Sequence, residues 1–333
     1  MSLPPVDALV SDQVIDAPDA SDKVHGKSPT RIALQRLRSD KVAVVAAAII
    51  AIIVLLAVLA PLICDLIGVE LRAGDPSEDL NLATAYGLVG PPEQAFTWSH
   101  PLGIAPRTAN DLTAEWLYGA RTSLEVATAA AVLSTLIGIV VGLVAGFSRG
   151  WLDRVITFVI DVCLSFPFLL GALALAAVLI NRFATDLDQL DRVQFVSLVA
   201  VLTFFGWMGL ARLIRGEVLS MREREFVEAA RVIGVPTRII LFRELLPNLV
   251  APIVVSFSLG LPAYVAAEAG LSFLGVGFTD RPSWGYTIVR AQSYFETYPL
   301  YLWAPIVGIM FLVISLNLLG DSIRDAFDPR TRR

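Results

Sequence analysis

The stretch Phe226-Val227-Glu228-Ala229-Ala230-Arg231-Val232-Ile233-Gly234 lies between two long apolar runs, and Glu244-Leu245-Leu246-Pro247-Asn248 follows it. Residues 223–233 have the pattern of a short helix, with Phe226, Ala230 and Ile233 on one apolar side. Gly234 ends this helix, and Pro236 suits the start of a second, amphipathic helix over residues 238–246. The pattern therefore predicts a helix–turn–helix between two apolar segments.

Two interpretations of this helix–turn–helix remain open from its spacing alone. Apolar side chains on a rigid element outside the apolar segments are typical of a surface that binds a partner protein. A surface loop that folds back on a membrane has the same spacing. Sequence features outside this helix–turn–helix are needed to choose between the two interpretations.

The composition indicates a membrane protein. Of the 333 residues, 56% are hydrophobic and only 17% are charged, whereas about a quarter of a soluble domain is charged. This excludes an ordinary soluble enzyme. The two cysteines, Cys64 and Cys163, are far apart and form no disulfide framework.

Six apolar runs are long enough to span a bilayer, which predicts an all-α integral membrane protein with six transmembrane helices. The runs are 42–63, 124–147, 155–180, 195–210, 249–274 and 302–319. Most of the 26 basic residues fall in segments 1–41, 148–154, 211–248 and 320–333. Because basic residues favour the cytoplasmic side, we expect both termini and the helix–turn–helix to be cytoplasmic.

The chain divides into five segments on this basis. We expect a flexible cytoplasmic tail over 1–30, without the pattern of a secretory signal, and a first span with a basic flank over 31–63. An extracytoplasmic loop follows over 64–121. The core of five spans covers 122–323, and a cytoplasmic tail covers 324–333.

No constellation of residues predicts catalysis on this chain. His25 and His100 lie near no cysteine or acidic cluster at ligand spacing, so we expect no metal site. Gly26-Lys27-Ser28 lacks the earlier glycine and the strand of a phosphate-binding loop. We therefore expect a non-catalytic protein without a cofactor of its own and without a nucleic-acid partner.

Several motifs together resemble one family. Glu228, Ala229, Ala230, Gly234, Leu246 and Pro247 resemble the EAA loop of ABC-importer permeases, here spanning 222–248. The segments that resemble the C-type subunit of dipeptide and oligopeptide importers are Tyr118-Gly119-Ala120-Arg121-Thr122-Ser123-Leu124, Asp161 to Ser165-Phe166-Pro167, Ala211-Arg212-Leu213 to Arg215-Gly216, Ala267-Glu268-Ala269-Gly270-Leu271-Ser272-Phe273-Leu274-Gly275, Pro282-Ser283-Trp284-Gly285, and Asn317-Leu318-Leu319-Gly320-Asp321 to Asp328-Pro329-Arg330. The chain departs from the family at Glu244, where histidine is usual.

The resemblance implies a type I ABC-importer permease in the cytoplasmic membrane, surrounded by lipid, which moves di- or oligopeptides by alternating access. It implies four kinds of partner: a second, B-type permease, two ATPase subunits that hold ATP and Mg, an extracytoplasmic substrate-binding protein, and the peptide. It also implies that a coupling helix docks on an ATPase through Phe226, Glu228, Ala229, Ala230, Ile233, Gly234, Leu246 and Pro247.

Other transport functions stay open beside this one. The same architecture carries nickel chelates, glutathione or other small solutes in related systems. An ion-driven secondary transporter and a membrane scaffold or receptor are alternatives from other classes. No internal repeat is visible in the sequence, which argues against the secondary transporter.

Three acids lie within the apolar runs and are candidates for the translocation pathway: Glu268, Asp161 and Glu125. Buried acids in membranes are costly and often line a pathway. Each also has a simpler explanation, because Glu125 is near water, Asp161 can brace helices or pair across an interface, and Glu268 lies toward the outer end of its span.

Two further patterns predict packing and anchoring. Gly138, Gly142 and Gly146 recur every fourth residue, which permits close approach of a second helix. Aromatic residues between 284 and 303, including Trp284 and Tyr301, are typical of the membrane–water interface. Contact of these aromatics with delivered substrate or with the binding protein is the alternative.

Overall fold

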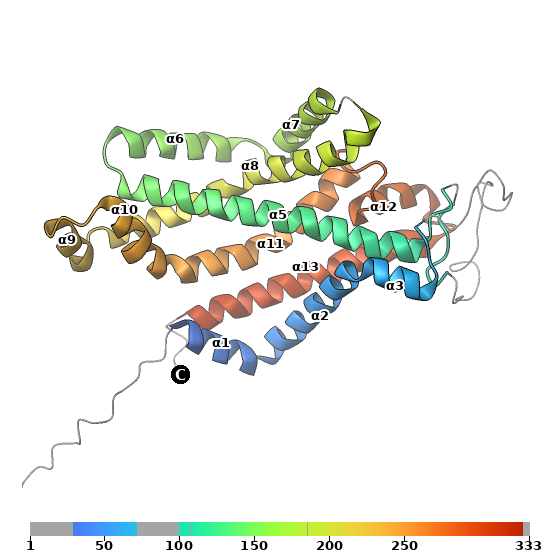
Figure 1. Cartoon of the computed structure of the whole chain (residues 1–333), viewed down its shortest axis with the longest axis horizontal. Coiled ribbons are helices and arrows are strands. Elements are labelled where there is room, and N and C mark those ends of the chain that lie inside the picture. The colour runs from blue at the N-terminus through green and yellow to red at the C-terminus, as the bar shows by residue number, and fades with distance from the viewer. Residues whose placement is uncertain (1–28, 72–99, 107, 185, 329–333) are drawn as a thin grey trace, which may run out of the picture.

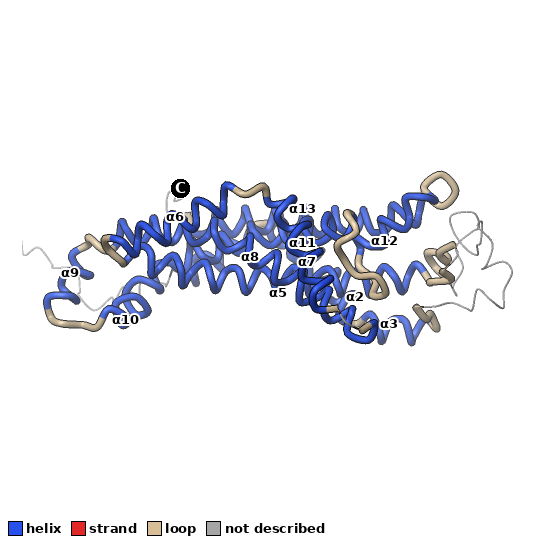
Figure 2. Tube along the Cα trace, turned by 90° about the horizontal axis from the view of Figure 1, so that it is seen from above, coloured by secondary structure: helices blue, strands red, loops and turns tan. Residues whose placement is uncertain are grey.

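A computed structural model describes residues 29–71, 100–106, 108–184 and 186–328. The predicted N-terminal tail, apart from its last residues, and the middle of the predicted outer loop lie outside this described part. Within it, the chain is helical, with one isolated antiparallel bridge between Ile104 and Asp111 and no strand (Figure 2). The all-α prediction is confirmed.

The helices that build the bundle follow one another along the chain. They are α1 (Pro29–Ser39), α2 (Lys41–Val58), α3 (Ala60–Ile67), α5 (Leu112–Phe147), α6 (Trp151–Ser165), α7 (Phe168–Phe183), α8 (Leu187–Met221), α9 (Glu225–Val232), α10 (Thr237–Ile239), a π-helical turn (Ile240–Leu245), two 3-10 turns (Leu246–Leu249 and Gln292–Tyr294), α11 (Val250–Phe273), α12 (Trp284–Ala291) and α13 (Pro299–Phe327). In Figure 1, α5 and α11 run between α6, α7 and α8 on one side and α13, α2 and α1 on the other.

Five helical segments in the described part are long and apolar enough to cross a membrane, and a bent pair makes a sixth candidate. That pair is α6 and α7, which meet at an angle of 93°. The predicted continuous helix over 155–180 is therefore wrong. Pro167 has no N–H and disfavours helical geometry at Phe166, which is extended at φ −73° and ψ 132°.

The close approach of α5 and α8 confirms the packing predicted for the three spaced glycines. A Cβ added to Gly142 would lie 2.7 Å from Cβ of Ile214 and 2.8 Å from the Ala211 carbonyl oxygen. Gly138 and Gly146 meet the α8 residues one turn before and one turn after. Any side chain at these positions would force the two longest helices of the bundle apart.

The first and last helices lie side by side near the same end of the molecule (Figure 1). Nη1 of Arg36 donates to the carbonyl oxygens of Ala326 and Asp328, both at 3.3 Å. Oγ of Ser322 donates to Oδ2 of Asp40 at 2.7 Å. These bonds join the α1–α2 junction to α13.

The opposite end differs from its prediction. Helix α5 begins at Leu112, within the predicted outer loop, because the side chain of Asp111 accepts from the backbone N–H groups of Thr113 and Ala114. Trp284 and Tyr301 are buried, so these two side chains contact protein and do not anchor the bundle in lipid headgroups. Nε1 of Trp284 donates to the Trp116 carbonyl oxygen at 3.0 Å, which fixes α12 against α5.

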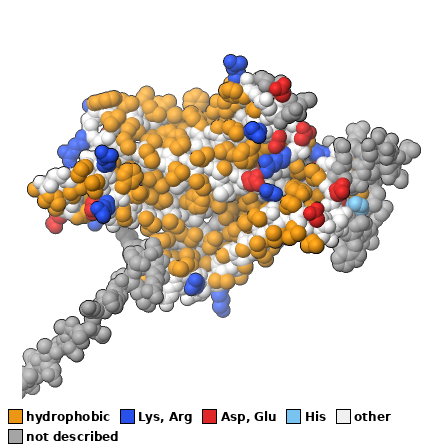
Figure 3. All heavy atoms as spheres, in the orientation of Figure 1, with side chains coloured by type: hydrophobic (Ala, Val, Ile, Leu, Met, Phe, Trp, Pro, Cys, Tyr) orange, Lys and Arg blue, Asp and Glu red, His pale blue; other side chains and the backbone are white. Residues whose placement is uncertain are grey.

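Hydrophobic side chains cover most of the middle of the visible face in Figure 3, and charged side chains gather toward the ends. Exposed apolar residues lie on α2, α5, α6, α7 and α13. In water such a surface would be very costly, but in a bilayer it faces hydrocarbon. The surface therefore agrees with the membrane prediction from composition.

Candidate functional site

Helix α9 projects from one end of the bundle, beside α10, and both views place α3 and α12 at the other end (Figures 1 and 2). We call these the α9 end and the α12 end. The position of α9 follows from the sequence between α8 and α11, which has a short amphipathic helix and no apolar run.

Two side chains fix α9 to the bundle. Val227 is fully buried and Ala230 is 9% exposed, and both belong to a cluster with Ile214 of α8 and Ile240. Of the three residues predicted to share an apolar side, Ala230 faces the bundle, whereas Phe226 and Ile233 are exposed. Ile233 follows the last helical residue, and the turn there moves its side chain off the helical face.

The turn after α9 requires a glycine. Gly234 has φ 80°, in the left-handed region, and its N–H donates to the Arg231 carbonyl oxygen at 3.0 Å. The N–H of Val235 donates to the Ala230 carbonyl oxygen at 3.0 Å, which satisfies another carbonyl at the helix end. The predicted break at Gly234 is confirmed, and the chain resumes as helix directly after Pro236.

The second predicted helix is not a separate element. Residues 238–246 form the beginning of one helical segment, Thr237–Phe273, that continues through a π-helical turn into the membrane span. Leu246 is half-buried in the same cluster as Val227, and Pro247 is exposed. The turn at Gly234 thus connects α9 directly to a spanning helix.

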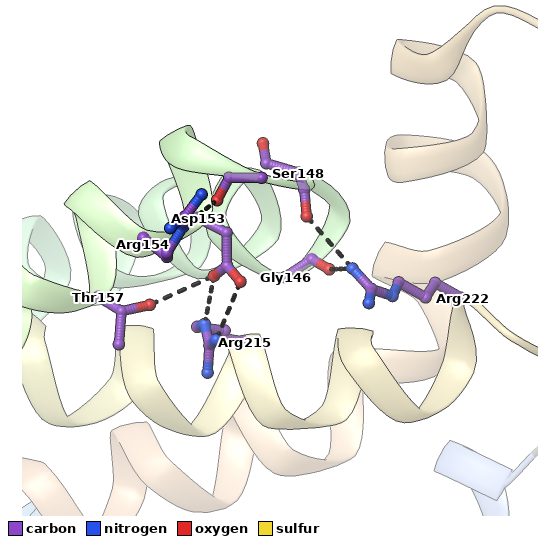
Figure 4. Close-up of polar contacts among 8 residues, drawn as sticks. Gly146, Ser148, Asp153, Arg154, Thr157, Arg215 and Arg222 are labelled. Carbon is purple, nitrogen blue, oxygen red and sulfur yellow. Dashed lines mark hydrogen bonds and ion pairs between the residues drawn. The ribbon is translucent and has the colours of Figure 1, made fainter.

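Ion pairs and backbone contacts brace the structure behind α9 (Figure 4). Nη1 of Arg222, at the end of α8, donates to the carbonyl oxygens of Gly146 at 3.1 Å and Ser148 at 3.2 Å. Arg215 donates twice to Asp153, at 2.8 and 3.1 Å, and Thr157 donates to the same carboxylate at 3.2 Å. These contacts tie α8 to the connection between α5 and α6.

The outward side of α9 carries exposed apolar side chains and the carboxylate of Glu228. Phe226 is 40% exposed, Val232 is 86% exposed and Ile233 is 78% exposed. Glu228 and Ala229 are exposed beside them. No residue in the described part of the chain pairs with the carboxylate of Glu228. We call Phe226, Glu228, Ala229, Val232 and Ile233 the α9 surface.

The three intramembrane acids lie in three separate places. Glu125 of α5 accepts from Nε of Arg121 at 3.0 Å and also pairs with Arg281. Asp161 of α6 pairs with Arg212 of α8, and both side chains are more than half exposed. The structure thus gives Glu125 and Asp161 each a basic partner and does not bring them together.

Glu268 of α11 is fully buried. Its Oε1 accepts from Oγ of Ser272 at 2.9 Å, and its Oε2 has no partner within the described residues. Close packing surrounds it, because a Cβ added to Gly285 of α12 would lie 2.6 Å from the carbonyl oxygen of Ala269. A pathway role for these acids stays a prediction.

The sequence matches a known family over most of these elements. Residues 138–333 match the family of binding-protein-dependent transport system inner membrane components, and residues 28–71 match the N-terminal TM domain of oligopeptide transport permease C. The chain belongs to the first of these families. It is therefore an ABC-importer permease, and all of α9 and its surface lie within the matched residues.

Several relatives are similar to the permease over much of its length. It is 31% identical over 318 residues to the dipeptide transport system permease protein DppC of Alkalihalophilus pseudofirmus, covering 95% of each chain. It is 33% identical over 235 residues to the glutathione transport system permease protein GsiD of Pectobacterium atrosepticum, covering 70% of this chain and 74% of that one.

A solved structure supports the type I fold of the permease. In the inward-facing MetNI methionine ABC transporter, one chain superposes with a TM-score of 0.51 at 18% identity, covering 64% of this chain and 96% of that chain. At this identity the likeness concerns the fold alone. It does not extend over the full length of the permease.

One buried ion pair of the permease escaped the sequence analysis. Glu115 of α5 is 1% exposed, and its Oε1 accepts from Nη1 of Arg290 at 3.1 Å and from Nδ2 of Asn110 at 3.0 Å. Its position was predicted as part of an outer loop, so a buried carboxylate was not expected. The Asp111 cap followed by an acid in the first turn was the available signal.

Proposed function

We propose that this chain is the C-type permease subunit of an ATP-driven peptide importer, with the α9 end in the cytoplasm. The single observation that carries the proposal is the exposed apolar α9 surface on a braced support. An isolated apolar patch of this kind costs free energy in water unless a partner covers it. The ATPase subunit of an ABC importer is the partner that such a surface fits.

The excess of basic residues near the α9 end supports this orientation. The residues Arg222, Arg224, Arg231, Arg238 and Arg243 lie between α8 and α11. Both described chain ends also lie toward this side in Figure 1. With basic segments inside, both termini face the cytoplasm and α12 faces outward.

Coupling follows from how α9 is held. Closure of the ATPases on ATP moves the α9 surface, and Val227 and Ala230 transmit the movement to α8 because they are packed against it. Arg222 passes the movement to the end of α5. The turn at Gly234 passes it to the segment that becomes α11. A rigid connection is required, since a flexible one would lose the displacement before it reached the membrane.

The catalytic work falls on partner chains under this proposal. Two ATPase subunits bind ATP and Mg, a B-type permease completes the passage, and an extracytoplasmic binding protein delivers the peptide. The permease chain itself hydrolyses nothing. The described residues contain no group of three or more His, Cys, Asp or Glu that could hold a metal ion.

Peptides are the cargo that the relatives favour. The match over 95% of a dipeptide permease, together with the oligopeptide match over residues 28–71, supports a peptide of two or more residues. Because one relative is a glutathione permease, glutathione, a γ-linked tripeptide, is the second candidate for the cargo. Uptake assays with both classes of peptide distinguish them.

The test is a reconstituted complex of this chain with its partner permease, ATPases and binding protein in proteoliposomes. We expect uptake of labelled peptide that requires ATP. Glu228→Arg reverses the charge on the α9 surface and should abolish this uptake while the chain remains in the membrane. Glu217→Arg is the matched control, because Glu217 is an exposed acid of α8 outside the α9 surface.

Three results would contradict the proposal. Normal uptake by well-expressed Glu228→Arg would remove the docking role. Uptake driven by an ion gradient without ATP would support a secondary transporter instead. Purification of the chain without any ATPase, under conditions that preserve known complexes, would favour a scaffold or receptor.

A further inference from the structure

A groove between α5, α8 and α11 has a chemistry unlike the rest of the membrane-spanning surface. Its volume is about 350 Å³. Four residues with hydroxyl groups line it, Ser134, Thr135, Ser256 and Tyr264, and so do Gly209 and Gly260. None of its lining residues carries a charge at neutral pH. We call these six residues the hydroxyl groove.

The groove lies among three of the membrane-spanning helices. Ser134 and Thr135 are near the middle of the apolar run 124–147, Gly209 is near the end of the run 195–210, and Ser256 is toward the start of the run 249–274. None of the ion pairs described above lines it. It is thus an uncharged polar hollow between apolar spans, where an unpartnered polar group is costly.

Two of the hydroxyl groups have no partner in the protein. Thr135 and Ser256 make no hydrogen bond within the described residues, although Ser134 donates to the carbonyl oxygen of Thr203 at 3.4 Å. Hydroxyl groups of membrane helices normally bond to their own or a neighbouring backbone. These two hydroxyl groups are therefore available to bond a polar molecule in the groove.

The glycines shape the groove. A Cβ added to Gly206 would collide with the Tyr264 hydroxyl and lie 2.7 Å from Oγ of Ser134. Gly206 therefore allows both hydroxyl groups to lie against the backbone of α8. A Cβ added to Gly209 would meet nothing within 4 Å, so the groove is open there.

We infer that the hydroxyl groove is this chain's share of the passage and that it binds the main chain of an extended peptide. A peptide passing between apolar spans must replace the water on its N–H and C=O groups, and a hydroxyl group both donates and accepts. Because hydroxyl groups are uncharged, they can hydrogen-bond to the main chain of a peptide whatever the charge of its side chains. This inference rests on the proposed function and adds the residues that contact the cargo.

A blocking variant with a matched control tests the site. A Cβ added at Gly209 or at Gly270 meets no atom within 4 Å, so Gly209→Leu places a bulky side chain in the groove, and Gly270→Leu adds the same side chain to α11 outside the groove. In the reconstituted complex we expect Gly209→Leu to lower peptide uptake about tenfold or more, because a bulky side chain takes the space of the cargo. Gly270→Leu should leave uptake near the wild-type rate, and both should retain ATP hydrolysis stimulated by the binding protein.

Chemical labelling tests the same site without measuring transport. In a variant lacking Cys64 and Cys163, Thr135→Cys should react with a charged, membrane-impermeant thiol reagent in nanodiscs, and bound peptide should slow the reaction. Leu136→Cys is the matched control, because Leu136 is the next residue and its side chain is 55% exposed on the apolar surface. In lipid it should not react, since the reagent needs water and a thiolate.

The outcomes separate this inference from the proposed function. If the wild-type complex fails to import peptides with ATP, the proposed function is wrong. If the wild type imports peptides but Gly209→Leu does so equally fast, or if Thr135→Cys is as unreactive as Leu136→Cys, lipid or a partner helix fills the groove and the inference alone is overturned.

Discussion

The α9 end and the α12 end use the same kinds of residue in opposite ways. At the α9 end, Phe226 and Ile233 are exposed while the charged residues Arg215 and Asp153 brace the helices behind them. At the α12 end, Trp284 and Tyr301 are buried, and Glu115 is paired with Arg290 inside the protein. One end leaves apolar side chains exposed, whereas the other buries its aromatic side chains and pairs its buried charges within the chain.

The difference predicts where substitutions have their effect. A change on the α9 surface should alter coupling to a partner and leave the free energy of unfolding nearly unchanged. A change in the interior of the α12 end should lower stability first, because no partner is needed to complete its contacts. The comparison is wrong if substitutions on the α9 surface mainly lower stability and substitutions inside the α12 end mainly alter coupling.

The largest expected effect is at the turn after α9. Gly234→Val places a β-branched residue at φ 80°, where an L-residue costs about 1–2 kcal/mol. The turn should therefore rearrange and separate α9 from the helix that follows. We expect ATP-dependent uptake to fall about tenfold or more, a loss that corresponds to about 1.4 kcal/mol. Proteoliposome uptake at equal protein amount measures it.

Gly234→Asn is the matched control for this change. Asparagine tolerates the left-handed region better than any β-branched residue, and an added Cβ meets no atom within 4 Å at this position. It should retain most of the uptake. Equal loss in both variants would show that something other than backbone conformation matters at Gly234.

The second effect concerns stability at the α12 end. Arg290→Met removes the cation that faces Glu115 and leaves a carboxylate that is 1% exposed without its charged partner. Removing one member of a buried ion pair costs about 3–5 kcal/mol. The thermal midpoint of the purified protein in detergent should drop clearly. The double variant Glu115→Gln/Arg290→Met should recover much of the loss, and if it does not, the ion pair is not the cause.

Much of the bundle could be predicted from the sequence, because a bilayer imposes a simple rule on apolar runs. The runs at 42–63, 195–210 and 302–319 all became helices, and the spacing of Gly138, Gly142 and Gly146 correctly predicted a close helix contact. Beside the α9 surface, Gly234 correctly predicted the end of the short helix and Pro236 the start of the next one. Both signals are local, so no tertiary information was needed.

The wrong predictions concern features that depend on contacts between residues far apart in the sequence. Nothing local shows that Val227 is buried in place of Phe226, since the choice depends on Ile214 and Ile240. The bend at Pro167 had a local signal, but the apolar run on both sides concealed it. From the sequence alone, Trp284 is equally compatible with an interface anchor and with a buried side chain. The structure shows that its N–H donates to the Trp116 carbonyl oxygen.

The smallest effect is at the contact between the chain's first and last helices. Asp40 accepts from the Ser322 hydroxyl and from the N–H of Val42, and these hydrogen bonds hold its pKa below its ordinary value of 3.8. A carboxyl group with a lowered pKa stabilises the folded state above its ordinary pKa. That contribution is lost as the pH falls through the lowered pKa, because protonation then occurs in both states.

Asp40→Asn should therefore destabilise the permease slightly at pH 7, and the difference from the wild type should shrink below about pH 3.8. Thermal midpoints of both proteins between pH 7 and pH 3 measure this. Ser322→Ala should produce the same small loss at pH 7, since it removes the hydroxyl that donates to Asp40. A difference between Asp40→Asn and the wild type that stays constant over this pH range would show that the ionised carboxylate is not what joins α2 to α13. The packing of Ile53 and Ala57 of α2 with Leu312 and Leu316 of α13 would then hold these two helices together.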